Sequence, residues 1–184
     1  MAIVNSLQSP RFCGIRSFMR MPVAYGSTDA DVVVLGIPFD SATSYRPGAR
    51  FGPAAIREAS NILKPHCPVL DVNITEHLSI IDGGDIDTVP GYLEESLDRM
   101  RDGLTPYMKS KVVPILLGGD HLVSLGILRA VHAARGPVAL VHFDAHSDTI
   151  DSYFGKPYNH GSPFYWAIKE GLIDARHSIQ MGIR

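Results

Sequence analysis

The sequence predicts an α/β protein built around a parallel β-sheet. Short apolar segments alternate along the chain with longer segments of helical periodicity. Most of the apolar segments run without polar interruption, which is typical of strands that are covered on both faces. Alternation of strands and helices favours a layered sheet with right-handed crossovers. No linker or internal repeat divides the 184 residues, so we expect one domain over residues 1–184.

Five strands and four helices are expected in alternation. The strands are predicted at 32–37, 79–84, 112–119, 138–144 and 178–183, and the helices at 53–62, 93–109, 122–134 and 163–170. The second helix repeats Leu97, Met100 and Leu104 at helical spacing. The third helix is stopped by Gly136-Pro137.

Composition argues against several classes of partner. The formal net charge is -2, so no basic excess indicates a nucleic acid partner. No apolar run approaches the roughly 20 residues that span a bilayer, so we expect no membrane insertion. Cys13 and Cys67 do not form a metal-binding spacing, and we interpret them as reduced thiols. Without a clear targeting signal, the expected location is cytoplasmic.

Residues able to bind metal follow two neighbouring predicted strands. Ligands bind at the carboxyl ends of strands in such sheets. Asp144-Ala145-His146-Ser147-Asp148 ends the fourth strand, and in an extended segment its three alternating side chains point to one side. Gly118-Gly119-Asp120-His121 ends the third strand. Two carboxylates and an imidazole suit Mn, Fe, Co or Zn, although a single Asp-x-His usually binds nothing. Together the two motifs predict a metal site.

These motifs resemble two signatures of the ureohydrolases, the arginase and agmatinase family. Further segments resemble the agmatinase branch of that family, namely 10–15, 18–20, 46–57, 82–85 and 159–164. The resemblance covers nearly the whole chain, and it implies a three-layer α/β/α sandwich around a parallel sheet. It also implies that the full-length enzyme is a homo-oligomer, a trimer or a hexamer.

The resemblance implies a binuclear manganese centre that hydrolyses agmatine to urea and putrescine. His121, Asp144 and Asp148 would bind one Mn²⁺, and Asp144, as a bridge, and His146 would bind the other. A hydroxide held between the ions would attack the guanidinium carbon. His160 and Asp148 are the expected catalytic residues, with His160 moving a proton or orienting the leaving amine.

The chain lacks one motif that the resemblance leads us to expect. The family carries a second metal motif, Asp-x-Asp, later in the fold, and no such motif follows residue 148 here. Asp85-Ile86-Asp87 has the spacing but comes too early in the order. The sequence thus offers four of the six expected protein ligands. We therefore interpret the chain as an N-terminal portion that ends after the fifth strand, which would expose an apolar edge at 178–183.

Three alternatives stay open at this stage. A guanidinobutyrase or another guanidino-acid hydrolase would bind a substrate carboxylate, for which Lys156 is a candidate, whereas Asp151 would favour the second cation of agmatine. A catalytically silent family member would bind a partner or a guanidino ligand. A zinc deacetylase of related architecture fits least well, because the segments at 46–57 and 118–121 do not match it.

Overall fold

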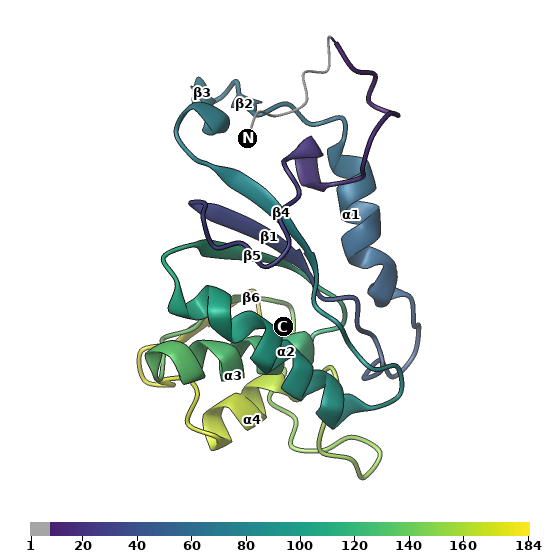
Figure 1. The fold of residues 1–184 in the computed structure, drawn as a ribbon. Helices are drawn as coiled ribbons and strands as arrows, with labels where there is room; N and C mark the ends of the chain where they lie inside the picture. The colour runs from purple at the N-terminus through teal and green to yellow at the C-terminus, as the bar shows by residue number, and fades with distance from the viewer. Residues whose placement is uncertain (1–7) are drawn as a thin grey trace.

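Helices cover both faces of a parallel sheet in the computed structural model, which describes residues 8–184 (Figure 1). The strands are β1 (Val32–Gly36), β2 (His66–Cys67), β3 (Val72–Asn73), β4 (Ile80–Asp85), β5 (Val113–Leu117), β6 (Val141–Phe143) and β7 (Ile179–Met181). The α-helices are α1 (Gly52–Ser60), α2 (Leu93–Lys109), α3 (Val123–Arg135) and α4 (Pro163–Lys169). Short 3₁₀ helices are η1 (Phe18–Arg20), η2 (Ala49–Phe51) and η3 (Ile74–Glu76).

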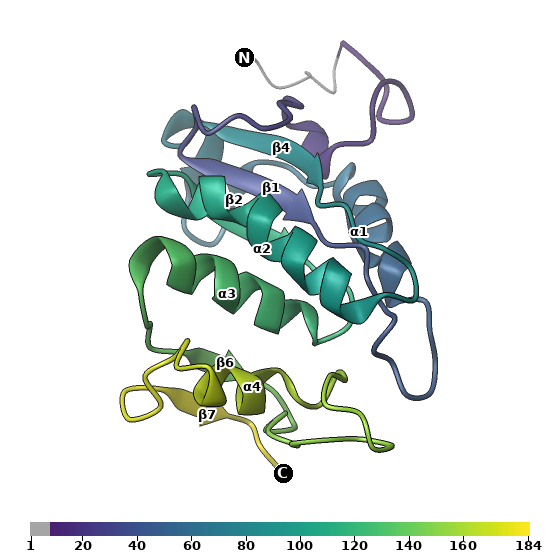
Figure 2. The same cartoon turned by 60° about the horizontal axis from the view of Figure 1, so that its bottom comes forward.

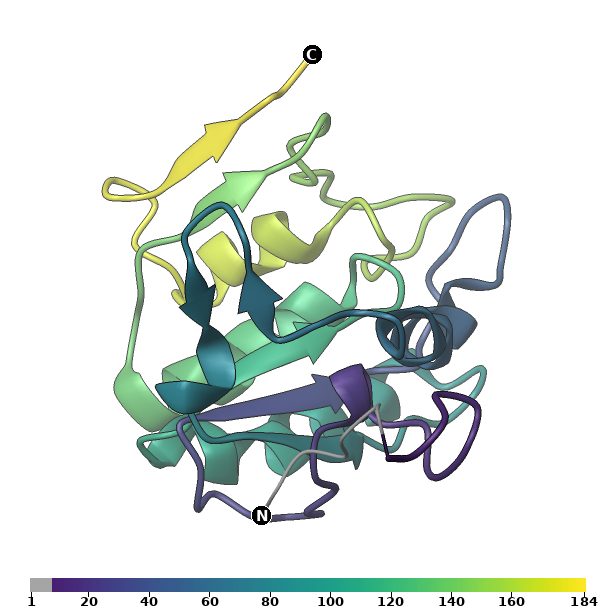
Figure 3. The same cartoon turned by 90° about the horizontal axis from the view of Figure 1, so that it is seen from above.

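The five expected strands are present and pair in parallel, but as two sheets. One sheet has the order β4-β1-β5, with Val33 opposite both Ile81 and Pro114. The other sheet pairs β6 with β7, with His142 opposite Gln180. Figure 3 shows the second sheet set apart from the first, on the side of β5. Apolar runs identify strands but not their pairing partners, so the sequence alone did not predict this division.

Helices α2 and α3 lie on one face of the three-stranded sheet, and α1 lies on the opposite face (Figures 1 and 2). All five residues of β1 are buried between these layers. Gly126 of α3 lies against α2, because a Cβ there would be 2.8 Å from the Cβ of Met100. This close approach joins α2 and α3 into one layer. With α1 on the opposite face of the sheet, the predicted layered α/β/α sandwich is confirmed.

A buried ion cluster ties α1 to β4. The guanidinium of Arg57 donates from Nε to Asp82 Oδ2 at 2.8 Å and from Nη1 to Asp85 Oδ1 at 2.6 Å. Arg57 and Asp82 are both buried. Burial has the largest single effect on the pKa of Arg57 and lowers it. The hydrogen bonds to Asp82 and Asp85 together outweigh burial, so the pKa of Arg57 is raised and the guanidinium stays charged. Two segments that carried the family resemblance, 46–57 and 82–85, thus meet in space.

Strands β5 and β6, which belong to different sheets, carry exposed apolar side chains. Val113 and Ile115 on β5 are exposed, as are Val141 and Phe143 on β6. At the expected apolar edge, Ile179 of β7 is half exposed. Among the residues that the structure describes, these side chains have no covering layer on that face.

Two features of the fold were not predicted from the sequence. The β2–β3 hairpin has two residues in each strand, which is too short to show a periodicity. The 3₁₀ helices are equally short.

In residues 8–184, no helix combines the length and the apolar character needed to cross a membrane.

Candidate metal centre

The turn from β5 to α3 places His121 at the carboxyl end of the sheet. Gly119 begins this turn with φ of +82°, and a Cβ on it would lie 2.7 Å from the carbonyl oxygens of Ile37 and Phe39. Only glycine fits this approach. The backbone N–H of Asp120 then donates to Phe39 O at 2.7 Å, which fixes the start of the turn against the loop after β1.

The segment after β6 carries the two carboxylates. Asp144 remains tied to β7, since its N–H donates to Met181 O at 3.0 Å. Asp144, His146 and Asp148 would point to one side only in an extended segment, and this condition is not met. Strand β6 ends at Phe143, and Asp148 has φ of +50°. The chain turns back at Asp148, whose carbonyl oxygen accepts from the N–H of Phe164 at 3.1 Å.

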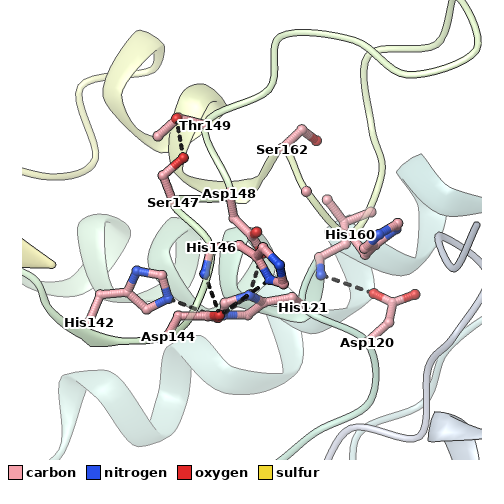
Figure 4. Close-up of polar contacts among 12 residues, drawn as sticks. Asp120, His121, His142, Asp144, His146, Ser147, Asp148, Thr149, His160 and Ser162 are labelled. Atoms are coloured by element: carbon pink, nitrogen blue, oxygen red, sulfur yellow. Dashed lines mark hydrogen bonds and ion pairs between the residues drawn. The ribbon is translucent and has the colours of Figure 1, made fainter. Parts of the chain in front are cut away.

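His121 lies between the two carboxylates (Figure 4). Its Nδ1 is 2.5 Å from Asp148 Oδ2 and 3.4 Å from Asp144 Oδ2. All three side chains are only partly exposed. Three of the four predicted metal ligands, namely His121, Asp144 and Asp148, therefore lie together, with both carboxylates close to Nδ1 of His121.

His146 lies at the rim of this group. Its backbone N–H donates to Asp144 Oδ1 at 3.0 Å, whereas its Nδ1 is 3.8 Å from the same oxygen. The side chain is 71% exposed. The His146 backbone hydrogen bond holds the pKa of Asp144 below its usual range, with further lowering from His142 and His121. Asp144 is thus kept as a carboxylate, the form that binds metal.

His142, which was not among the predicted ligands, joins the group. His121, His142 and Asp144 each offer one possible ligand atom, and these atoms lie within 4.8 Å of one another. His142 Nε2 is 3.2 Å from Asp144 Oδ2. A signal was present in the sequence, because His142 lies two positions before Asp144 in the predicted strand at 138–144, and residues two apart in a strand share a face.

His160 lies in a second group beside the first (Figure 4). Its Nδ1 and its backbone N–H both donate to the carbonyl oxygen of Ala42, at 3.0 and 3.2 Å. The N–H of Ala42 in turn donates to Asp120 Oδ2 at 2.9 Å. Burial raises the pKa of Asp120 to about 6, against the lowering effect of the N–H groups of Ala42 and Leu122.

The donor set fits a hard or borderline divalent cation. The carboxylate oxygens of Asp144 and Asp148 converge on the imidazole of His121 at the ends of β5 and β6. The carboxylates of Asp144 and Asp148 face the imidazole of His121, and within residues 8–184 the structure gives Asp148 no cationic partner other than histidine. This arrangement suits Mn²⁺ as well as Zn²⁺ or Co²⁺, because ligand types alone do not separate these metals.

The family model described as the arginase family matches residues 30–184. Proclavaminate amidinohydrolase of Streptomyces clavuligerus is 41% identical over 98% of this chain and 58% of its own length. Guanidinopropionase of Pseudomonas aeruginosa is 40% identical over 98% of this chain and 57% of its own length. An agmatinase of Salmonella paratyphi B is 41% identical, with shares of 98% and 58%. The chain thus spans less than two thirds of the length of these relatives.

Solved structures share the fold. The structure of the Streptomyces clavuligerus amidinohydrolase superposes with a TM-score of 0.89, covering 96% of this chain and 58% of the other at 41% identity. Trypanosoma cruzi formiminoglutamase with Mn²⁺ has a TM-score of 0.79 at 25% identity, with shares of 91% and 57%.

Proposed function

Because the chain belongs to the arginase family, we propose that it acts as a manganese-dependent amidinohydrolase on a guanidino substrate, with agmatine favoured. The products would be urea and putrescine. The observation that carries the proposal is the convergence of Asp144 and Asp148 on Nδ1 of His121. The relatives named agmatinase and guanidinopropionase support hydrolysis of a guanidino group.

Four residues of this chain would contribute ligands to two Mn²⁺ ions. His121, Asp144 and Asp148 would bind one ion, and Asp144 and His146 the other. When bound, the metal supplies Lewis-acid chemistry and makes water a nucleophile near neutral pH. The exposure of His146 leaves its side chain free to turn toward Asp144. The Mn²⁺ in the formiminoglutamase structure supports the choice of metal.

His160 is suited to proton transfer. A carbonyl oxygen only accepts, so the contact of Nδ1 with Ala42 O places the proton on Nδ1. In the neutral imidazole, Nε2 then carries the free lone pair. We propose that Nε2 of His160 takes up the proton that the attacking water releases and passes it to the leaving amine, or that it orients that amine. Asp148 contributes to catalysis by holding His121 and its metal in place.

The loop at 149–158 is the candidate for substrate selection. It lies next to His160, since the rings of Tyr153 and His160 are 6.3 Å apart between centroids. Asp151 and Lys156 are both exposed on this loop. A carboxylate at Asp151 favours the second cation of agmatine, whereas Lys156 favours a guanidino acid. The guanidinopropionase relative, at an identity close to that of the agmatinase, supports this second candidate substrate class.

The test is urea release from agmatine, arginine and 4-guanidinobutyrate in added Mn²⁺. Urea from agmatine alone, with preference lost in Asp151→Asn and kept in Lys156→Met, is the expected result. Urea from 4-guanidinobutyrate, lost in Lys156→Met, would show instead that the substrate is a guanidino acid. Bound Mn²⁺ without urea from any substrate would contradict hydrolysis and favour a silent binding role.

The oligomeric state rests on the family resemblance alone, and we propose that the full-length enzyme is a homo-oligomer, a trimer or a hexamer. From the net charge, the apolar runs and the targeting signals of the sequence, we propose that the protein contacts neither nucleic acid nor membrane and is located in the cytoplasm. Sedimentation of the purified protein checks the oligomeric state, and a monomer would contradict it.

A further inference from the structure

His142 is a buried imidazole that the proposed function does not use. It is 6% exposed and sits in β6, directly opposite Gln180 of β7. Its ring packs against Phe164 at 4.4 Å and against His121 at 5.3 Å between centroids. The ring is therefore held in one orientation by its neighbours, with both nitrogens in contact with polar groups.

The Gln180 side chain determines which nitrogen of His142 carries the proton. The terminal atom of Gln180 that faces Ser147 lies 2.8 Å from its backbone carbonyl oxygen. A carbonyl oxygen only accepts, so this atom is the amide nitrogen Nε2. The same nitrogen is 3.0 Å from His142 Nδ1, so its second hydrogen points there. Nδ1 of His142 is then an acceptor, and the proton of the neutral imidazole lies on Nε2.

The proton on Nε2 points at a metal-binding carboxylate. His142 Nε2 is 3.2 Å from Asp144 Oδ2, an oxygen that can only accept when Asp144 is ionised. A protonated Nε2 has no lone pair left for a metal ion. The closeness of His121, His142 and Asp144 thus does not make His142 a ligand, despite its ligand-type side chain.

We propose that Gln180 and His142 are positioning residues that orient the carboxylate of Asp144 toward the metal. Gln180 fixes the tautomer of His142, and His142 fixes the rotamer of Asp144 by donating to one of its oxygens. In many metal sites, partners of this kind hold the metal ligands in place, and their loss typically costs about 10–100-fold in metal affinity. The metal role rests on the proposed function, whereas the tautomer of His142 does not.

The tautomer is tested by ¹⁵N NMR of the histidine-labelled chain without metal or substrate. We expect His142 to carry its proton on Nε2 in the wild type, and we expect the second tautomer to appear in Gln180→Leu. A proton on Nδ1 of His142 in the wild type would overturn the inference. This readout is independent of catalysis, so absence of urea release would leave it standing.

The positioning role is tested by Mn²⁺ titration of two matched variants. In His142→Gln the side-chain amide keeps an N–H donor at the position of Nε2, whereas His142→Leu has none. We expect His142→Leu to bind Mn²⁺ about 10–100-fold more weakly. We expect His142→Gln to retain most of the affinity. Equal losses in both variants would show that His142 is a ligand, and wild-type affinity in both would show that it has no role.

Discussion

Nδ1 of His121 lies 2.5 Å from Oδ2 of Asp148, although the two residues are 27 positions apart and follow different strands. Two local features produce this contact. The turn at Gly119 holds the chain against the carbonyl oxygens of Ile37 and Phe39, and at the positive φ of Asp148 the second segment turns back toward Phe164 of α4. The contact therefore depends on two backbone conformations as well as on the residue types.

Replacement of His160 separates chemistry from metal binding. His160→Ala removes the proposed proton carrier, so urea release should fall by about 10²–10⁴-fold. Mn²⁺ affinity should stay unchanged, because His160 donates to Ala42 O and not to the metal cluster. His177→Ala removes an exposed histidine that is paired with Asp174 and is the control, with activity close to wild type. Loss of Mn²⁺ in His160→Ala would mean that His160 is a ligand.

Replacement of Arg57 tests the buried ion cluster. Arg57→Ala leaves Asp82 buried without its cation, which should lower the free energy of unfolding by about 3–5 kcal/mol. Arg99→Ala removes an exposed pair with Glu95 and should cost less than about 1 kcal/mol. Unfolding in guanidinium chloride measures both. Similar losses in the two variants would contradict a structural role for the cluster.

Asp40 makes the stability of the protein depend on acid pH. The side chain of Arg50 donates to Asp40 Oδ1, and with the N–H groups of Gly48 and Arg50 it holds the pKa of this buried carboxyl below its usual range. The carboxylate form therefore stabilises the fold above the unfolded pKa of about 4, and this stabilisation is lost as the pH falls through the lower folded pKa.

Asp40→Asn should accordingly lower the free energy of unfolding by about 1–3 kcal/mol at pH 7. The difference from the wild type should shrink as the pH falls below about 4, where the wild-type carboxyl also becomes neutral. Thermal unfolding at several pH values measures this, with the exposed Asp29→Asn as control. A difference that stays constant down to pH 3 would rule out the ionised form as the cause.

His146 tests the second metal position. The side chain is exposed and does not yet contact Asp144 closely, so its loss should weaken only the second Mn²⁺. We expect His146→Ala to retain one Mn²⁺ and to lose the other, as measured by metal analysis after dialysis. Retention of both ions would remove His146 from the ligand set.

Local periodicity predicted the fold well. Helix α2 has the predicted bounds, because Leu97, Met100 and Leu104 repeat over several turns. The placement of His121 and Asp144 at strand ends followed from the general rule for parallel sheets. Their convergence in space, however, required the turn at Asp148, which no residue pattern indicated.

Long-range contacts were less visible in the sequence. The anchor of His160 is the carbonyl oxygen of Ala42, a group that every residue carries, so no side chain marks it. The pair of Arg57 and Asp82 joins a helix to a strand and has no spacing of its own. His142 shares a strand face with Asp144, but its role depends on Gln180, which is opposite it only once β6 and β7 pair.

The most direct test of the metal centre is calorimetric titration of the purified chain with Mn²⁺, alongside His121→Ala and His177→Ala. His177 is an exposed histidine bound to Asp174, away from the centre, and serves as the matched control. Saturable Mn²⁺ binding in the wild type and in His177→Ala, abolished in His121→Ala, is the predicted result. Equal binding in all three proteins, or none in any, would contradict a metal centre at His121.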